Sequence, residues 1–372
     1  MRAALIEGCG RPPVLADHPE PVPGPGWVPV RVLAAPITPL DLLCASGTSY
    51  FGTPALPYVP GVQGVGTAGG RLVWFPTSAG MAPGDGSMAE VALVRAGDLV
   101  ELPAGVDPVA MAALGLSAVA AYLALTWRGE LAAGEQVLVL GAGGVVGQAA
   151  VQLARIAGAR RVVAAARSAA GRIRAKQAGA DAVVSLDMSN PEDAAGSGNA
   201  GDARSAGGAG SAGGAGSAGG AGSAGGRGGA GGAGGAGDAD RVDVLVARLA
   251  AVCDGPVDLV LDPLFGVPAA AAARMLRPSG RLVNLGGSAG EASPLDSATL
   301  RSRSLRVLGY TNNELSPEQR AAAIGEIAEL VAQGRLHVAH EAVPLADIAS
   351  AWERQSAGQA SGRLVVTPQP SA

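Results

Sequence analysis

The spacing of apolar residues is most regular near the middle of the chain, in residues 136–159. A short apolar run from Val137 to Leu140 ends in the glycine-rich segment 141–147. Beyond it the apolar residues recur every three or four positions, at Val146, Ala150, Leu153 and Ala157. A short continuous apolar run is typical of a buried strand, and the second spacing is typical of an amphipathic helix. The pattern therefore predicts a strand, a tight turn and a helix.

The following residues repeat this alternation of strand and helix. We predict further strands at 161–166, 182–186, 257–262, 281–287 and 304–310, and helices at 242–252 and 269–276. Strands that alternate with helices of about 10–15 residues form right-handed crossovers in a parallel sheet. The predicted fold class for this part of the chain is therefore α/β, with a parallel sheet.

The N-terminal residues 1–115 show a different pattern, in which Pro and Gly separate short apolar runs such as 72–75 and 91–94. Val28, Val30 and Val32 alternate with other residues, as in a strand with one buried face. This pattern predicts a compact, β-rich, barrel-like module. It is followed by an alanine-rich segment, 107–125, that we predict to be helical.

Near the C-terminus, Ser316, Pro317 and Gln319 predict the start of a helix, because they supply an N-cap, a proline in the first turn and a capping box. We expect this helix to stop at Gly334. An amphipathic turn at 345–352 and a closing strand at 363–366 follow.

One segment, about 190–240, has low complexity. Its repeat of Ser, Ala and Gly has a period of six residues, marked by Ser205, Ser211, Ser217 and Ser223. Such a composition has few side chains to bury and a large entropic cost of ordering, so we predict that it is disordered. We interpret it as an expanded loop of the α/β part; the alternative is a functional tether.

Composition excludes several classes of function. Charged residues make up 16% of the chain, the net charge is −4, and no basic stripe is visible, which argues against a nucleic-acid surface. Cys9, Cys44 and Cys253 lie far apart, so neither a disulfide framework nor a thiolate zinc knuckle is indicated, and a reducing cytoplasm fits best. The first residues have too short an apolar run for a signal peptide, and we find no uninterrupted apolar segment of about 18 residues. We expect a cytoplasmic protein that does not enter a membrane.

The glycine-rich turn carries the strongest candidate chemistry. A helix N-terminus offers unpaired N–H donors and a positive dipole end to a diphosphate, and glycine lets the ligand approach the backbone. The candidate residues for binding a dinucleotide are Gly141, Gly143, Gly144, Val145, Val146 and Gly147. Strict G-x-G-x-x-G spacing fails because Val146 occupies its last place. The alternative is a glycine-rich turn that joins strand and helix and binds nothing.

The end of the second strand favours NADPH as the cofactor. An acid that binds the ribose hydroxyls of NAD belongs about 20 residues after the glycines. Ala166 stands there instead, followed by Arg167 and Ser168, with Arg172 and Arg174 further on. Guanidinium groups bind a 2′-phosphate and a carboxylate would repel it. The alternative is that these arginines only solvate a helix face.

Because ligands of such sheets sit at the carboxyl ends of strands, we also expect 285–287 (Leu285, Gly286 and Gly287) to face the nicotinamide.

Taken together, the sequence resembles the medium-chain dehydrogenase/reductase superfamily, and within it the zinc-free quinone oxidoreductase branch. Apart from the Gly/Ala/Ser-rich segment, the resemblance covers nearly the whole chain. It rests on the order and spacing of several short pieces: 19–26, 36–41, 57–66, 86–90, Gly115-Leu116-Ser117 before Tyr122, the glycine-rich turn and 358–366.

The resemblance implies a Rossmann doubly wound parallel sheet plus a GroES-like β-rich catalytic domain, with NADPH in the cleft between them. The implied boundaries are 1–116 for the N-terminal part of the catalytic domain, 117–312 for the Rossmann domain with its insert at 190–240, and 313–372 for the return to the catalytic domain. The strand at 304–310 implies a homodimer that pairs two copies at the sheet edge.

The resemblance also implies that zinc is absent. Zinc-dependent relatives carry a cysteine where Thr38 stands and a Gly-His-Glu box where Val62 and Gln63 follow Gly61. Because thiolate and imidazole ligands are needed to hold zinc, we expect no metal site. The two histidines at 337 and 340 lack further ligands, and we expect them to face solvent.

The implied reaction is hydride transfer from NADPH to a quinone or another conjugated carbonyl or alkene, which is a small-molecule electron acceptor. We assign Thr38, Asp41 and Tyr50 to the substrate side. Thr38 stands where relatives have asparagine, and Leu43 occupies a position that is aromatic in some of them. A structural hydrogen bond to the backbone is the favoured interpretation of Asp41. Two alternatives stay open: an enoyl-thioester reductase of the same superfamily, and a non-catalytic NADPH-binding sensor or scaffold.

Overall fold

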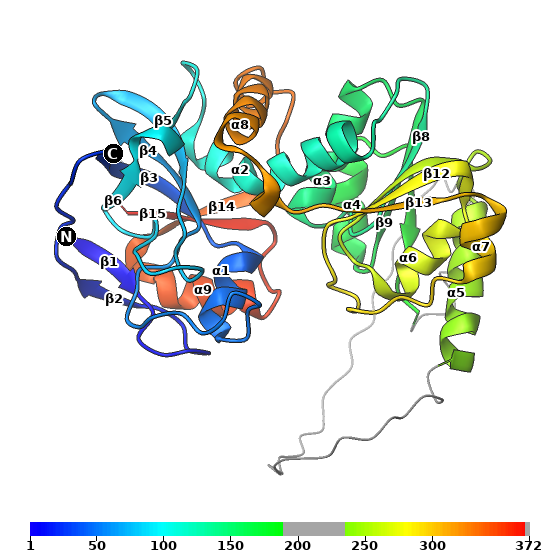
Figure 1. Ribbon diagram of the computed structural model, residues 1–372, viewed down its shortest axis with the longest axis horizontal. Helices are drawn as coiled ribbons and strands as arrows, with labels where there is room; N and C mark the ends of the chain where they lie inside the picture. Colours follow the sequence, from blue (N-terminus) through cyan, green and yellow to red (C-terminus); the bar gives the residue numbers. More distant parts are fainter. Residues whose placement is uncertain (189–234, 369–372) are drawn as a thin grey trace, which may run out of the picture.

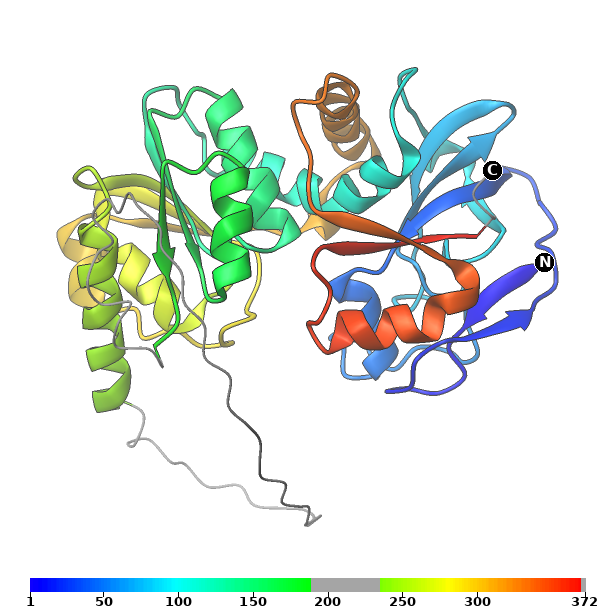
Figure 2. The ribbon, with the colours of Figure 1, turned by 180° about the vertical axis from the view of Figure 1, so that it is seen from behind.

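The computed structural model describes residues 1–188 and 235–368, and these form two lobes that lie side by side (Figure 1). Each lobe is built on its own sheet. The view from behind shows the first and last parts of the chain together in one lobe, although they are distant in sequence (Figure 2). The middle of the chain forms the other lobe.

The first lobe contains a seven-stranded sheet in the order β14-β15-β3-β4-β5-β7, with β6 paired to β3. Only the β14–β15 pair is parallel. The strands are β3 (Trp27–Pro36), β4 (Gln63–Ala68), β5 (Arg71–Pro76), β6 (Val91–Arg95), β7 (Val100–Glu101), β14 (His340–Pro344) and β15 (Arg363–Thr367). A separate antiparallel pair is formed by β1 (Arg2–Leu5) and β2 (Val14–Asp17). The β-rich module predicted from the sequence is confirmed.

Several elements of this lobe were not predicted, including a helix and a glycine-containing strand. A helix, α1 (Pro39–Ser46), follows β3, and β4 has glycine at positions 64 and 66. A side chain at Gly66 would lie 2.3 Å from the Arg31 carbonyl oxygen, and one at Gly64 would lie 2.7 Å from the Phe75 ring. The glycines are needed for close packing inside the sheet. Because they interrupt the apolar pattern of β4, this strand was not predicted from the sequence.

The second lobe contains the predicted parallel sheet. Six strands lie in the order β10-β9-β8-β11-β12-β13, and every neighbouring pair is parallel. The strands are β8 (Gln136–Val139), β9 (Arg161–Ala166), β10 (Ala182–Ser185), β11 (Val257–Asp262), β12 (Leu276–Asn284) and β13 (Arg306–Gly309). This is the doubly wound order of the Rossmann fold, in which the strand order reverses between the first and fourth strands, here β8 and β11.

Helices cover both faces of this sheet. Val137 and Val139 face the cluster that includes α3 (Val145–Ile156) and α4 (Ala169–Gln177), whereas Leu138 and Leu140 face α5 (Gly235–Ala250) and α6 (Gly266–Ala273). A further helix, α7 (Ser297–Ser302), precedes β13. Because both faces are buried, the strands are continuous apolar runs, which is why the sequence predicted them well.

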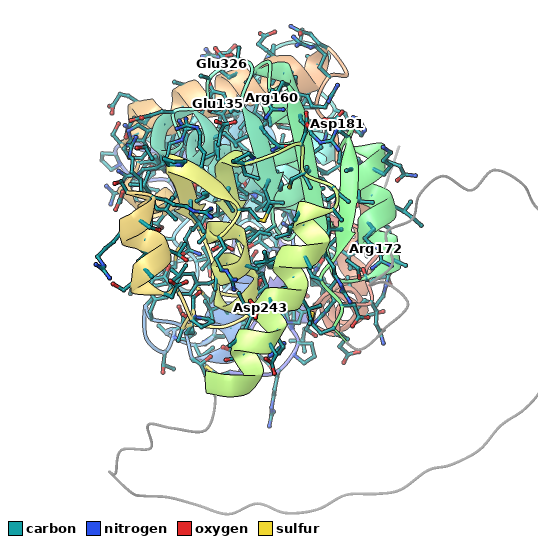
Figure 3. All side chains as sticks on the ribbon, turned by 90° about the vertical axis from the view of Figure 1, so that its right-hand side faces the viewer. Glu135, Arg160, Arg172, Asp181, Asp243 and Glu326 are labelled. Atoms are coloured by element: carbon teal, nitrogen blue, oxygen red, sulfur yellow. The ribbon has the colours of Figure 1, made fainter. Side chains whose placement is uncertain are left out.

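The two ends of the parallel strands have different surroundings (Figure 3). Glu135, Arg160 and Asp181 precede β8, β9 and β10, and they lie together along one edge of the sheet. Arg172 lies toward the opposite edge, where its guanidinium donates to the Ser185 hydroxyl at the end of β10. The carboxyl ends of the parallel strands therefore lie on the side of the sheet opposite Glu135.

The boundaries of two predicted elements are wrong. The helix predicted at 242–252 starts earlier, because α5 begins at Gly235, so residues 235–240 are helical rather than part of a disordered segment. The rest of that segment, 190–234, lies outside the described residues. The helix predicted at 269–276 is α6, which ends at Ala273, and Leu276 already pairs with Val257 in β12. A third predicted element also has wrong bounds: the strand predicted at 281–287 is β12, which begins at Leu276 and ends at Asn284, so residues 278–280 lie within it, where the register shifts.

Helix α2 (Pro108–Leu123) connects the lobes and continues into a π-helical turn, η2 (Ala124–Arg128). Together they form the one described helix that is long and apolar enough to span a membrane, although Ser117 and Thr126 interrupt its apolar run. Most of it is buried against α3, β3 and β4, as in a core helix. The helix is kinked at Gly115, whose φ is 29° and ψ −128°.

After β13 the chain returns to the first lobe through a short turn, η4 (Asn312–Glu314), and α8 (Pro317–Ala332). Ser316 caps α8, and Gln319 completes the predicted capping box. Gly334 has φ 67° just after the helix, as predicted for its end. A 3-10 turn, η5 (Leu345–Asp347), α9 (Ile348–Ser356) and β15 complete the lobe. One more short 3-10 helix, η1 (Ala96–Asp98), lies between β6 and β7.

Candidate nucleotide and substrate site

A cavity of about 620 Å³ opens at the carboxyl ends of the parallel strands. Its walls come from the turn after β8, the start of α4 and the loops after β10, β11 and β12. In open parallel sheets, ligands bind at this edge beside the point where the strand order reverses. The position of the cavity is therefore the one expected of a nucleotide site.

The predicted strand–turn–helix is confirmed, and its glycines have distinct roles. Gly141 has φ 61°, which glycine adopts without strain. A Cβ on Gly147 would lie 2.4 Å from Ala142 Cα, so Gly147 lets α3 pack closely on the end of β8. Gly144 is the N-cap of α3, and a Cβ there would meet only the Gly141 carbonyl oxygen, at 3.5 Å.

Gly144 therefore leaves open space at the N-terminus of a helix, directly on the cavity. Helix N-termini attract anions because their first N–H groups are unpaired and the helix dipole is positive there. A side chain at this position would fill the space. The local geometry fits a diphosphate.

Five of the predicted cofactor residues line the cavity: Gly141, Gly143, Gly144, Arg167 and Ser168. The others do not line it: Val145, Val146, Gly147, Arg172, Leu285, Gly286 and Gly287. The loop after β12 does contribute, through the next two residues, Ser288 and Ala289. Binding by any of these residues stays a prediction.

The other end of the cavity is formed by the turn between β9 and α4. Ala166 ends β9, and Arg167 beside it is exposed. Ser168 caps α4 by accepting from the Gly171 N–H at 3.1 Å. Arg174 donates through Nε to the Gly143 carbonyl oxygen at 3.0 Å, which ties α4 to the glycine-rich turn. Arg172 instead donates to the backbone of Arg167 and the hydroxyl of Ser185.

Several lining residues were missed in the sequence because they belong to other helices and loops, distant along the chain from the glycine-rich turn: Leu186, Arg241, Leu264, Val267 and Pro268, together with the pair after β12. Beside them lies the fully buried carboxylate of Asp262, which accepts from the N–H groups of Leu264 and Phe265 at 2.9 Å. Burial raises the pKa of Asp262, and these hydrogen bonds lower it.

The same turn contains backbone strain. Phe265 has φ 56° and ψ −151°, a conformation that costs a side-chain-bearing residue about 1–3 kcal/mol. Such strain gathers at functional sites, and no sequence pattern predicts it at this phenylalanine.

On the substrate side, Thr38 and Asp41 contact each other in the first lobe and are 5% and 2% exposed. The Thr38 hydroxyl donates to Asp41 Oδ2 at 2.6 Å and accepts from the Asp41 N–H at 3.3 Å. Asp41 also accepts from the N–H groups of Thr38, Gly61 and Val62. These contacts agree with the favoured interpretation, in which Asp41 forms structural hydrogen bonds to the backbone.

A buried arginine lies near this carboxylate. Arg363 donates to the Ile37 carbonyl oxygen at 2.8 Å and to the Ser117 hydroxyl at 3.0 Å. Burial lowers the pKa of Arg363 to about 10, and the charge of Asp41 opposes this shift. For Asp41 burial raises the pKa, while its hydrogen bonds with Thr38 and Val62 and the charge of Arg363 lower it. Because all its hydrogen-bond partners are donors, we take Asp41 to be ionised.

Tyr50 differs from these two residues, because it is 75% exposed. Its hydroxyl accepts from Asn313 Nδ2 at 3.4 Å, and its ring stacks at 4.2 Å on Phe51. Asn313 belongs to the segment that returns from the second lobe, so this contact joins the two lobes. Leu43, the other position noted in the sequence, is also exposed. The catalytic roles of Thr38, Asp41 and Tyr50 stay predictions.

Comparison with known proteins agrees with this architecture. Residues 236–366 match a family model described as zinc-binding dehydrogenase. Quinone oxidoreductases from Lama guanicoe and Pongo abelii are 37% and 38% identical over 164 and 170 residues, each covering 42% of this chain. The solved quinone oxidoreductase of Thermus thermophilus, whose complex with NADPH is also known, has a TM-score of 0.68 and 27% identity, and covers 99% of this chain and 100% of its own.

The chain is therefore similar to members of the medium-chain dehydrogenase/reductase superfamily and, within it, to quinone oxidoreductases. It spans about half the length of the curated relatives that it matches, 49% and 50% for the two quinone oxidoreductases. The resemblance inferred from the sequence, and the mixed fold that it implied, are both confirmed.

The zinc in the family description has no evident counterpart here. Among residues 1–188 and 235–368, no group of three or more His, Cys, Asp or Glu side chains is placed to hold a metal ion. His337 and His340 are both exposed. The His340 ring contacts the Val338 carbonyl oxygen at 2.9 Å.

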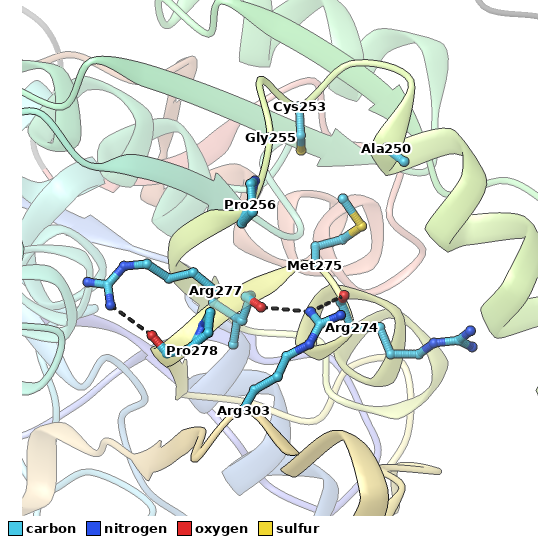
Figure 4. A pocket seen from close by; sticks show the side chains of 10 residues that line it. Ala250, Cys253, Gly255, Pro256, Arg274, Met275, Arg277, Pro278 and Arg303 are labelled. Atoms are coloured by element: carbon cyan, nitrogen blue, oxygen red, sulfur yellow. Dashed lines mark hydrogen bonds between the residues drawn. The ribbon is translucent and has the colours of Figure 1, made fainter. Parts of the chain in front are cut away.

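A second cavity, of about 470 Å³, lies at the opposite ends of the parallel strands (Figure 4). Arg274, Arg277 and Arg303 line it, with Cys253 and Met275. Arg303 donates to the carbonyl oxygens of Arg274 and Leu276, at 2.6 and 2.7 Å. The other two arginines pair with Asp243 and Asp258. Because its guanidinium groups are already engaged, this cavity is a poorer anion site than the one beside Gly144.

Proposed function

We propose that this protein is an NADPH-dependent oxidoreductase that transfers hydride to a quinone or another conjugated carbonyl or alkene, without a metal ion. The main support is the cavity beside Gly144, where a helix N-terminus with open space meets exposed arginine at the end of β9. The names of the matched relatives support the same chemistry.

NADPH, when bound, supplies the hydride. The residues of this chain bind and orient it: Gly141 and Gly144 admit the diphosphate, and Arg167 and Arg174 give positive charge to the adenosine end. The absence of an acid where β9 ends favours a 2′-phosphate over a free ribose hydroxyl. A site without a strong Lewis acid favours acceptors that are easily reduced.

Protonation of the reduced acceptor requires a donor. Thr38 and Asp41 are poorly suited, because the Thr38 hydroxyl proton is held by a buried carboxylate. Tyr50 is better placed: its oxygen accepts from Asn313, and no described residue accepts its O–H proton. We assign proton donation to Tyr50 or to water. If Tyr50 donates, the Tyr50→Phe variant loses about 100-fold or more in turnover with little change in NADPH affinity.

The deciding experiment follows NADPH consumption with a simple quinone, together with the binding of NADPH and NADH. Gly144→Val fills the open space beside the helix N-terminus and abolishes both binding and turnover, while Gly144→Ala gives a smaller loss. Arg167→Ala reduces the preference for NADPH over NADH by about 10-fold or more, because a charge-assisted hydrogen bond contributes about 1.5–3 kcal/mol. An unchanged preference in Arg167→Ala contradicts the phosphate assignment.

We also propose a homodimer. Strand β13 is at the edge of the six-stranded sheet and Val307 in it is 41% exposed, so its backbone is open to pairing with a second copy. Light scattering that gives the mass of one chain overturns this part of the proposal.

A further inference from the structure

The nucleotide cavity is lined by several cationic side chains, and one of them lies outside the motifs on which the resemblance rests. Arg241, near the start of α5, lines the cavity together with Arg167 and Arg174 of the β9–α4 region. These three guanidinium groups come from a turn and from two different helices. Among the described residues that line the cavity, none is acidic. The cavity therefore carries more positive charge than its glycine-rich turn and helix dipole provide.

The position of Arg241 follows from how α5 is fixed. Arg248 on the same helix donates to the carbonyl oxygens of Ser185 and Asp187, at 3.1 and 2.6 Å, which holds α5 at the carboxyl end of β10. Arg241 precedes Arg248 by seven residues, which is about two turns or roughly 10 Å, so both lie on one helix face. Arg241 is thus carried beyond the ends of the strands, to the level of the ligand. Figure 1 shows the first turns of α5 extending past the sheet.

Arg241 is also free to change partner. It forms an ion pair with Asp238 in the preceding turn, at 3.3 Å, and the two side chains are 55% and 41% exposed. Exposed pairs of this kind contribute little to stability. By contrast, Arg174 is tied to the Gly143 backbone. A strongly charged ligand group can therefore draw Arg241 away from Asp238.

The chemistry of the ligand then follows from charge. The diphosphate of a dinucleotide sits at the helix N-terminus beside Gly144. Arg167 follows the end of β9, where the adenosine ribose of a dinucleotide binds, and Arg174 and Arg241 line the same cavity. An additional phosphate at the adenosine end accounts for this arrangement, since guanidinium groups bind phosphate bidentately and desolvate readily.

We propose that Arg241 is a specificity-determining residue that binds the 2′-phosphate of NADPH, together with Arg167 and Arg174. This inference rests on the proposed function, because it names a further residue of the same cofactor site. It also links two parts of the chain: the phosphate joins the start of α5 to the β9–α4 turn, so the bound cofactor holds the first turns of α5 in place.

The test compares adenosine 2′,5′-bisphosphate with adenosine 5′-monophosphate, which lacks only the 2′-phosphate, by calorimetric titration of the full chain. The variants are Arg241→Gln and a control of equal charge change, Arg301→Gln, on α7. Arg301 is exposed, donates to the Ser297 hydroxyl on its own helix and does not line the cavity.

We expect Arg241→Gln to weaken the bisphosphate about 10- to 100-fold and to leave the monophosphate within about twofold, while Arg301→Gln changes neither. Equal weakening of both ligands, or none, overturns the assignment of Arg241. If the wild-type protein does not distinguish the two ligands, the NADPH assignment fails and the inference fails with it. The two failures are therefore distinguishable.

Hydrogen exchange gives an independent readout. The bisphosphate slows exchange of the backbone amides in residues 237–245 of the wild-type protein, because its phosphate fixes the start of α5. It has no such effect in Arg241→Gln. Equal protection in both proteins contradicts the proposed contact.

Discussion

The kink of α2 gives the sharpest test of how the two lobes are joined. Gly115 interrupts the helix, and its φ of 29° is unfavourable for a residue with a side chain. A Cβ at this position would lie 2.1 Å from Gln63 Oε1. Gln63 is 1% exposed, and the same oxygen accepts from Trp74 Nε1 at 3.0 Å and from the Leu116 N–H at 2.8 Å. Gly115→Ala therefore strains the backbone and displaces a buried amide that holds two donors.

The expected loss of stability is large. The backbone conformation costs about 1–3 kcal/mol for alanine. Displacing the amide weakens the hydrogen bonds of Trp74 and Leu116, and each buried donor left unpaired costs about 1–3 kcal/mol. We expect Gly115→Ala to lower the free energy of unfolding by about 3–6 kcal/mol, a large part of the roughly 5–15 kcal/mol that holds a typical domain.

Urea unfolding followed by tryptophan fluorescence measures this loss, since Trp74 is fully buried in the native state. Gly325→Ala is the matched control, because it lies in α8 with no atom within 4 Å of the added Cβ, and it should be neutral or slightly stabilising. In a Gln63→Ala background the clash is gone, so Gly115→Ala should cost at least about 2 kcal/mol less than in the wild type. Equal costs in the two backgrounds refute the proposed conflict.

Other contacts give three more predictions. Gly147→Ala places a Cβ 2.4 Å from Ala142 Cα, so it should destabilise by about 1–3 kcal/mol and weaken NADPH binding, as thermal unfolding and titration will show. Asp41→Asn replaces a buried carboxylate that accepts from the N–H groups of Thr38, Gly61 and Val62 by an amide whose NH2 group cannot accept, so it should lower the free energy of unfolding by about 1–3 kcal/mol; no measurable loss contradicts this role. Burial raises the pKa of Cys253 to about 11, so its maleimide labelling should accelerate about tenfold per pH unit up to that value, with exposed Cys9 labelled first near neutral pH.

The parallel sheet was predictable because its strands are buried on both faces. The predicted limits of β9 and β11, at 161–166 and 257–262, are those observed. In both, a continuous apolar run is bounded by turns, and nothing in the tertiary structure shifts its ends. The capping box at Ser316 succeeded for a similar reason, since all its partners lie within one helical turn.

The features that were not predicted from the sequence depend on distant parts of the chain. Gly66 is required by the Arg31 carbonyl oxygen, which belongs to another strand, and the kink at Gly115 is required by Gln63 from β4. Likewise Arg241 reaches the cavity because Arg248 and the buried side chains of α5 fix this helix against the sheet. Each feature depends on a contact between distant segments, and local residue patterns do not contain that information.

On the substrate side, too, the sequence did not reveal which polar groups are already hydrogen-bonded, and this affects the chemistry that they can perform. Sequence position placed Thr38 and Asp41 in the reactive region, but both roles of the Thr38 hydroxyl are used within this pair, as donor and as acceptor. The carboxylate in turn holds the N–H groups of Gly61 and Val62, the segment that supplies zinc ligands in zinc-dependent relatives. A buried carboxylate engaged in this way stabilises the loop and has no proton to give. Of the three residues assigned to the substrate side, Tyr50, which contacts Asn313 between the lobes, keeps a hydroxyl proton that no described residue accepts.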